Sequence, residues 1–125
     1  MNIGVAGIGR QKDWIVEIDY SVEMDSYGLN VTHRGIELMT EGVPLDKIEM
    51  LQKFLINDKD GETFAVCSGA GGRVEFRLHD ESLWLFLWDG GQNDNKNLIK
   101  VSWLREEYLD FAIALKDAIE DARTK

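Results

Sequence analysis

Residues 13–24 read DWIVEIDYSVEM, and apolar and polar side chains alternate along most of this stretch. Successive side chains of a β-strand point to opposite faces, so the alternation predicts a half-buried strand. Its even-numbered residues, from Trp14 to Met24, are all apolar or aromatic and are expected to face the core. Three acidic residues would then lie together on the opposite face, where alternate strand positions are roughly 7 Å apart and Ser21 lies between the last two acids: Glu17, Asp19 and Glu23.

The residues that follow predict further strands. Asp25-Ser26-Tyr27-Gly28 has the composition of a turn, and alternation resumes from Leu29 to His33. The phase of the alternation shifts at Arg34-Gly35, which predicts a bulge or a tight turn before Ile36 and Leu38.

Two segments have helical periodicity. Pro44 suits the first position of a helix, and apolar residues recur at helical spacing through Leu55, which predicts a short amphipathic helix. A second apolar stripe, from about Leu104 to Arg123, predicts a C-terminal helix with acidic residues near its positive N-terminal end. Between the two helices, short runs predict strands at residues 62–68, 73–79, 83–88 and 98–103.

These elements predict an α+β fold, and a chain of 125 residues suits a single domain spanning residues 1–125. Short connections favour antiparallel pairing. We therefore expect a curved antiparallel sheet of about six strands, with an inserted short helix and a C-terminal helix packed on one face. Residues 1–12 are expected to form a flexible leader or an edge strand. No internal repeat is evident in the sequence.

The acidity of the chain is concentrated in two segments. The net charge is −9; residues 13–25 contain five acidic residues and no basic one, and residues 106–121 contain six acidic residues and one lysine. Neutralisation of phosphates by Lys and Arg supplies most of the affinity for nucleic acids, so this charge argues against direct nucleic acid binding. The acidic strand face is either a solvated surface that keeps the protein soluble or a docking surface for a basic protein.

Nothing in the sequence predicts export. Cys67 is the only cysteine, which excludes an intrachain disulfide and fits a reducing compartment. The first residues place their basic side chains after an apolar run, the reverse of a secretory signal, and no apolar run is long enough to span a membrane. We expect a cytoplasmic protein.

Three glycine-containing motifs suggest ligands but fit simpler structures better. Gly4-Val5-Ala6-Gly7-Ile8-Gly9 resembles a dinucleotide-binding fingerprint, but a strand follows it where that motif needs a helix. Gly69-Ala70-Gly71-Gly72 is expected to be a hairpin turn and not a phosphate-binding nest. Asp58-Lys59-Asp60-Gly61-Glu62 lacks the glycine spacing of a calcium loop and is expected to be a turn.

The remaining residues that could bind a metal ion do not show the spacing of a known metal-binding motif. The polar loop at residues 89–97 offers oxygen ligands for a hard cation but matches no spacing rule. His33 and His79 are far apart in sequence and are each expected to cap the end of a strand. Cys67 is expected to be a buried strand cysteine. We therefore predict no catalytic residue, no metal site and no cofactor.

The stretch LWLFLW (residues 83–88) is apolar on both faces. Its leucines lie on one side of the predicted strand, and Trp84, Phe86 and Trp88 lie on the other. An uncovered aromatic triplet would approach the largest apolar patch that a monomer usually exposes. Either the sheet curls to cover both faces, or one face is an interface. The three aromatic residues are therefore candidate partner-binding residues beside Glu17, Asp19 and Glu23.

The overall layout resembles the small acidic immunity proteins that neutralise bacterial polymorphic and contact-dependent toxins. It shares with them a strand-rich chain, a Gly-rich turn, a Trp88-Asp89-Gly90-Gly91 segment before the last strand, and a C-terminal helix. The resemblance covers architecture only, and it implies a non-enzymatic cytoplasmic inhibitor of a basic toxin domain. Two alternatives stay open: a small-ligand-binding domain with a pocket lined by Trp84, Phe86, Trp88 and Trp103, and a homo-oligomeric structural module, such as a homodimer, that uses the aromatic strand.

Overall fold

The computed structural model describes residues 3–67, 73–88 and 99–124. Eight strands and two helices lie within these ranges: β1 (Ile3–Gln11), β2 (Trp14–Ser21), β3 (Ser26–His33), β4 (Ile36–Val43), α1 (Leu45–Asn57), β5 (Thr63–Cys67), β6 (Arg73–His79), β7 (Ser82–Trp88), β8 (Ile99–Leu104) and α2 (Arg105–Arg123).

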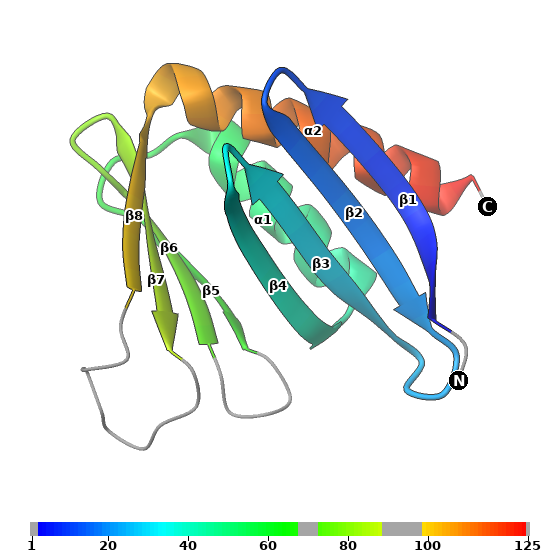
Figure 1. Ribbon diagram of the computed structural model, residues 1–125. Coiled ribbons are helices and arrows are strands. Elements are labelled where there is room, and N and C mark those ends of the chain that lie inside the picture. The colour runs from blue at the N-terminus through cyan, green and yellow to red at the C-terminus, as the bar shows by residue number, and fades with distance from the viewer. Residues whose placement is uncertain (1–2, 68–72, 89–98, 125) are drawn as a thin grey trace.

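The strands form two antiparallel sheets, sheet A in the order β1-β2-β3-β4 and sheet B in the order β5-β6-β7-β8. The α+β class, the antiparallel pairing and both helices are confirmed. The expectation of one curved sheet with about six strands is corrected, because the described residues contain two four-stranded meanders. Each meander is followed by a helix, a structural repetition that the sequence does not display (Figure 1).

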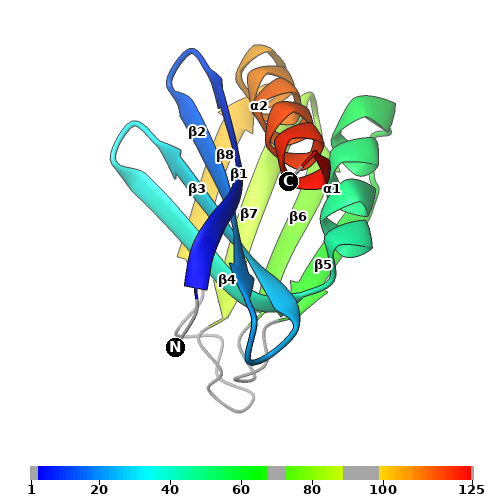
Figure 2. The same ribbon diagram turned by 90° about the vertical axis from the view of Figure 1, so that its right-hand side faces the viewer.

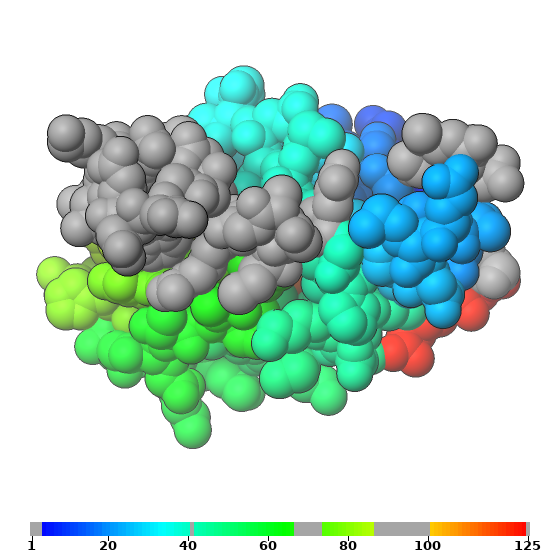
Figure 3. Space-filling view, turned by 90° about the horizontal axis from the view of Figure 1, so that it is seen from below, coloured from blue at the N-terminus to red at the C-terminus, as the bar shows by residue number. Residues whose placement is uncertain are grey.

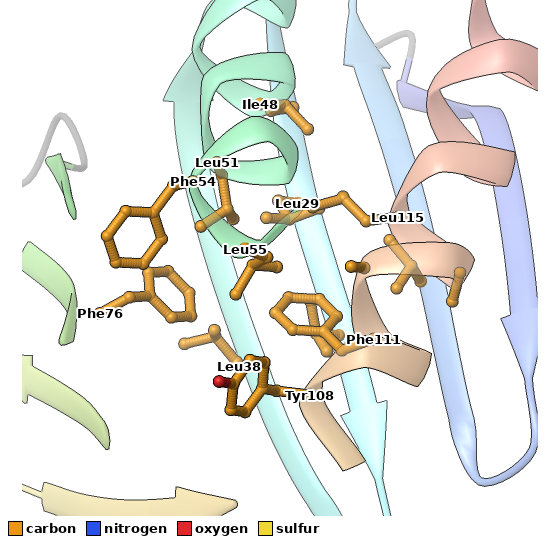
Figure 4. Close-up of a cluster of buried hydrophobic side chains, with 14 of the residues drawn as sticks. Leu29, Leu38, Ile48, Leu51, Phe54, Leu55, Phe76, Tyr108, Phe111 and Leu115 are labelled. Atoms are coloured by element: carbon orange, nitrogen blue, oxygen red, sulfur yellow. The ribbon is translucent and has the colours of Figure 1, made fainter. Parts of the chain in front are cut away.

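Both helices lie on the same side of sheet A, and sheet B closes the arrangement beside them (Figures 1 and 2). The interior that they enclose forms one hydrophobic core. In Figure 4, Leu51 and Leu55 of α1 meet Phe111 of α2, Leu38 of β4 and Phe76 of β6. Side chains from both sheets and both helices therefore share a single interior.

The N-terminal strand packs closely against the C-terminal helix because Gly7 and Gly9 have no side chains. A Cβ atom on Gly7 would lie 2.2 Å from the carbonyl oxygen of Ala118, and one on Gly9 would lie 1.9 Å from that of Ala114. The backbone N–H of Ile8 also donates to the Asp121 carboxylate at 3.1 Å. Of the two expectations for residues 1–12, the edge strand is the one observed over residues 3–11.

A buried aromatic cluster joins sheet A to sheet B. Trp14 stacks on His33 with ring centroids 4.0 Å apart and on Phe111 at 4.7 Å. The Trp103 indole N–H donates to Nδ1 of His33 at 3.0 Å. His33 is the last residue of β3, as predicted, but it lies in the core and links the sheets.

The ends of α1 follow from two residues. The helix begins directly after Pro44, and it ends at Asp58, which adopts the left-handed conformation with φ 51°. Such a residue cannot continue a right-handed helix, so the chain turns there toward β5.

Candidate functional site

The acidic strand predicted from residues 13–24 is β2, and two of its three candidate acids lie where predicted. Trp14, Val16 and Ile18 are buried in the core, so Glu17 and Asp19 lie on the opposite face, which we call the outer face of sheet A. In Figure 2 this is the side of sheet A away from the helices. The alternation of the sequence is therefore reproduced in the first half of the segment.

The third acid, Glu23, does not share that face. β2 ends at Ser21, and residues 22–25 form the turn to β3. Val22 and Met24, which were expected to face the core, are 56% and 63% exposed. The prediction was wrong at this end because residues 22–24 happen to continue the alternation, whereas the hairpin register pairs Ser21 with Ser26 and stops the strand.

Glu17 and Asp19 are uncompensated carboxylates. Neither forms an ion pair within the part of the chain that the structure describes. Glu37 of β4 stands on the same face, since it pairs with Thr32 and Thr32 pairs with Ile15 of β2. The one basic strand residue on that face among those described is Arg10, which pairs with Ile15.

Three acidic residues of α2, unlike Glu17 and Asp19, contact groups of sheet A or its turns. Glu107 lies 3.6 Å from the guanidinium of Arg34, Asp110 lies 3.4 Å from Lys12, and Asp121 accepts the hydrogen bond from β1. These contacts hold α2 to the ends of sheet A. The helix acids are thus partly structural, and they contribute less free negative charge than the sequence suggested.

A pocket of about 100 Å³ opens on the outer face of sheet A beside Asp19. This is well above the ~10–15 Å³ that one water molecule requires. Its walls come from β2, β3, β4 and the β2–β3 turn, and they include the exposed thioethers of Met24 and Met39. Figure 3 shows this end of the molecule, where the β2–β3 turn (bright blue) and strands β3 and β4 (cyan) reach the surface.

The pocket exists because the β3–β4 ladder is irregular. Leu29 pairs with Thr40 and Tyr27 pairs with Val43, so Gly28 faces two residues of β4 instead of one. Gly42 has φ 69°, the left-handed conformation that glycine adopts without strain. A Cβ on Gly28 would lie 3.1 Å from the Thr40 carbonyl oxygen, so a side chain there would crowd the floor of the pocket.

Two side chains that line the pocket from the outer face carry a buried oxygen with no hydrogen-bond partner among the described residues: Ser26 Oγ and Asn30 Oδ1. Leaving such an atom unsatisfied costs about 1–3 kcal/mol, so polar atoms of this kind are normally paired with protein, water or ligand. Their concentration at one pocket marks a place where a ligand would gain hydrogen bonds at little further desolvation cost.

Asp19 is the one carboxyl group among the described residues of this pocket, and no basic side chain lines it. Partial burial raises the pKa of its carboxyl above the ordinary value, because burial disfavours the charged form. A ligand that brings a positive charge to Asp19 would reverse this effect by stabilising the carboxylate.

The aromatic strand is split between two faces, as predicted. Leu83 and Leu85 are buried in the core, whereas Trp84 and Phe86 lie half-buried on the opposite face of sheet B. The side chain of Trp88 lies outside the described residues. Trp103 pairs with Leu83 and is on the core side, so the predicted pocket formed by Trp84, Phe86, Trp88 and Trp103 is corrected: Trp103 does not face Trp84 or Phe86.

Charged and aromatic side chains on the outer face of sheet B contact one another. Arg77 pairs with the buried carboxylate of Glu75, and its guanidinium lies 4.5 Å from the centre of the Phe86 ring. The indole Nε1 of Trp84 is buried and has no partner among the described residues. An interface role for this face stays a prediction.

A second cavity, of about 240 Å³, lies between α1, the β6–β7 turn and the start of α2. Its polar groups bind one another: Arg105 lies 2.6 Å from the Asp58 carboxylate, Tyr108 donates to the same carboxylate, and Asp60 accepts from the backbone N–H of Asp80 at 2.7 Å. Internal pairing leaves this larger cavity less suited to a ligand than the smaller one beside Asp19.

The remaining sequence motifs give no further site. The Gly69-Ala70-Gly71-Gly72 turn and the loop at residues 89–97 lie outside the described residues, although the strands that flank the former pair as a hairpin requires. His79 ends β6, and Cys67 ends β5 with a side chain that is not described. Across residues 3–67, 73–88 and 99–124, no group of three or more metal-binding side chains comes together.

Fold and surface define this chain as an α+β protein of two antiparallel meanders that presents an acidic sheet face with a polar pocket. No protein-family model, curated protein or solved structure gives a significant match to it. In the described part of the chain, neither helix has the combination of length and apolarity that a membrane crossing needs.

Proposed function

We propose that this protein is a non-enzymatic binding protein that docks a basic protein on the outer face of sheet A. The observation that carries the proposal is the coincidence of two uncompensated carboxylates, Glu17 and Asp19, with a pocket whose buried oxygens lack partners. A basic partner would supply both the opposite charge and the missing hydrogen-bond donors.

The physical consequence of such a surface is selective and fast association. Complementary potentials steer a basic partner toward the acidic face and disfavour acidic competitors. The resemblance to immunity proteins then suggests the kind of partner: a cationic toxin domain whose active site or neighbouring surface is covered on binding. Inhibition by occlusion needs no catalytic residue on this chain.

The test compares two charge reversals of equal size on different surfaces. Glu17→Lys/Asp19→Lys changes the outer face of sheet A, and Glu106→Lys/Asp117→Lys changes exposed acids on α2. Each variant is mixed with the protein encoded by the adjacent gene, and binding is measured by calorimetry at several salt concentrations. We expect the sheet A variant to bind at least about tenfold more weakly, and its remaining affinity to depend less on salt.

The α2 variant is the matched control, because it makes the same change in net charge. Equal weakening by the two variants would mean that only the total charge matters. Undiminished binding by the sheet A variant would remove this face from the proposal.

A further inference from the structure

We infer that the pocket beside Asp19 receives the side chain of an arginine from the basic partner. This inference rests on the proposed function and makes it specific: it names the chemical group that the acidic face recognises.

The charge of the pocket selects the sign of the ligand. Asp19 supplies its one carboxyl group among the described residues, and no basic side chain lines it. An anion would meet an uncompensated carboxylate there, whereas a cation would neutralise it. The pocket therefore favours a cationic group.

The hydrogen-bonding atoms select a ligand with several donors. Both unpartnered side-chain atoms on the pocket face are oxygens, from Ser26 and Asn30, and the Asp19 carboxylate adds two more acceptors. A guanidinium presents five N–H donors in a planar fork, matches a carboxylate with two parallel bonds, and keeps its charge at all relevant pH values. An ammonium has only three donors around a single point.

The apolar part of the lining favours a ligand whose cationic group is carried on a chain of methylene groups. Met24 and Met39 are 63% and 60% exposed at the rim, and Leu29 and Tyr27 contribute further carbon surface. A bare metal ion could not use these surfaces. The methylene groups of an arginine could lie along them, and methionine side chains adapt readily to such a stem.

The strand register places the acceptors on one side of the sheet. Asp19 pairs with Gly28, and Asn30 pairs with Glu17, so Asp19 and Asn30 are diagonal neighbours on the outer face. Such neighbours are separated by roughly 7–8 Å, which leaves space between them for a planar group. The missing side chain at Gly28 keeps that space open.

The inference is tested with the full-length protein and two matched small probes, followed by backbone amide NMR shifts. N-acetyl-arginine methylamide carries the guanidinium, and N-acetyl-citrulline methylamide has nearly the same shape without the charge. We expect saturable shifts centred on residues 19, 26–30 and 39–42 with the arginine probe, with a dissociation constant on the order of 1 mM. Citrulline should bind roughly tenfold more weakly.

Two variants locate the effect. Asp19→Asn should abolish the preference for arginine over citrulline, and Ser26→Ala should weaken binding of the arginine probe severalfold because it removes an unpartnered hydroxyl. Glu37→Gln is the control, since it removes a charge from the same face of sheet A but does not line the pocket. It should change the affinity for the arginine probe by less than about twofold. The spectrum of each variant also reports whether it is folded.

Equal binding of both probes, an unchanged preference in Asp19→Asn, or no saturable shift with the arginine probe would overturn the inference. These failures differ from failure of the proposed function. A partner whose binding depends on Glu17 and Asp19 without any arginine preference in the pocket contradicts the inference alone. Selective arginine binding without a basic protein partner contradicts the proposed function alone.

Discussion

At the scale of single residues, the buried His33 links sheet A to sheet B through a hydrogen bond with Trp103. Its ring lies between Trp14 and Trp103, and its Nδ1 accepts the Trp103 indole proton. That acceptor role requires neutral imidazole. Burial lowers the pKa of His33 below its ordinary value of 6.5, and the nearby Glu107 carboxylate opposes this effect only in part.

The stability of the protein should therefore fall as the pH is lowered through the ordinary histidine pKa. The unfolded chain takes up a proton near pH 6.5, whereas the folded protein resists it until a lower pH. The unfolded state then binds more protons, so the free energy of unfolding decreases on acidification, by at most about 1.4 kcal/mol per pH unit. Urea unfolding at about pH 7.5 and about pH 5.5 measures the effect.

Comparison with two variants isolates His33 from other titrating groups. His33→Gln should be less stable at the higher pH but lose much of the pH dependence in this window. His79→Gln, at an exposed strand end, should keep the dependence of the natural protein. An identical pH dependence in His33→Gln and the natural protein would show that His33 is not the responsible group.

At the scale of elements, the contact of β1 with α2 determines how the ends of the chain meet. Gly7 and Gly9 face Ala114, Ala118 and Ala122 along the helix, and the backbone of the strand lies directly on the backbone of the helix. Small residues on both sides allow this approach. The same glycines suggested a nucleotide motif in the sequence, whereas their observed role is packing.

Gly9→Ala should destabilise the protein strongly. The added Cβ would overlap the Ala114 carbonyl oxygen, which belongs to helix backbone and cannot move aside as a flexible side chain could. Overpacking of this kind costs about 1–3 kcal/mol or more. Thermal or urea unfolding measures the loss, and Gly4→Ala is the control, because no atom lies within 4 Å of a Cβ at that position. Similar stabilities for the two variants would contradict the close contact.

At the scale of the whole molecule, the two meanders share one interior. The buried cluster includes Val16 of sheet A, Phe76 of sheet B, Leu55 of α1 and Phe111 of α2. The last element, α2, also returns to pack on the first, β1. Neither half can bury its apolar side without the other, so the structural repetition is not a division into independent units.

We therefore expect a single cooperative unfolding transition. Tryptophan fluorescence, which reports on buried Trp14 and Trp103, and far-ultraviolet circular dichroism, which reports on both helices and both sheets, should give the same urea midpoint. Two separated transitions would show that the halves unfold independently.

Local patterns in the sequence determined the elements of this protein. The period of two in residues 13–21 and the period of 3.6 in both helices depend on neighbours along the chain, so the faces of Glu17 and Asp19 and the apolar sides of the helices were predictable. The end of β2 was not, because alternation in residues 22–24 resembles a strand until the hairpin register stops it.

Only the tertiary structure decided how the elements combine. Two sheets form in place of one, His33 joins them, and β1 lies on α2 because glycine and alanine meet across more than a hundred residues of chain. The pocket beside Asp19 likewise depends on three strands, a turn and a bulge at Gly42. Contacts between distant residues leave no local periodicity, and for this reason the sequence indicated an acidic face but not the pocket within it.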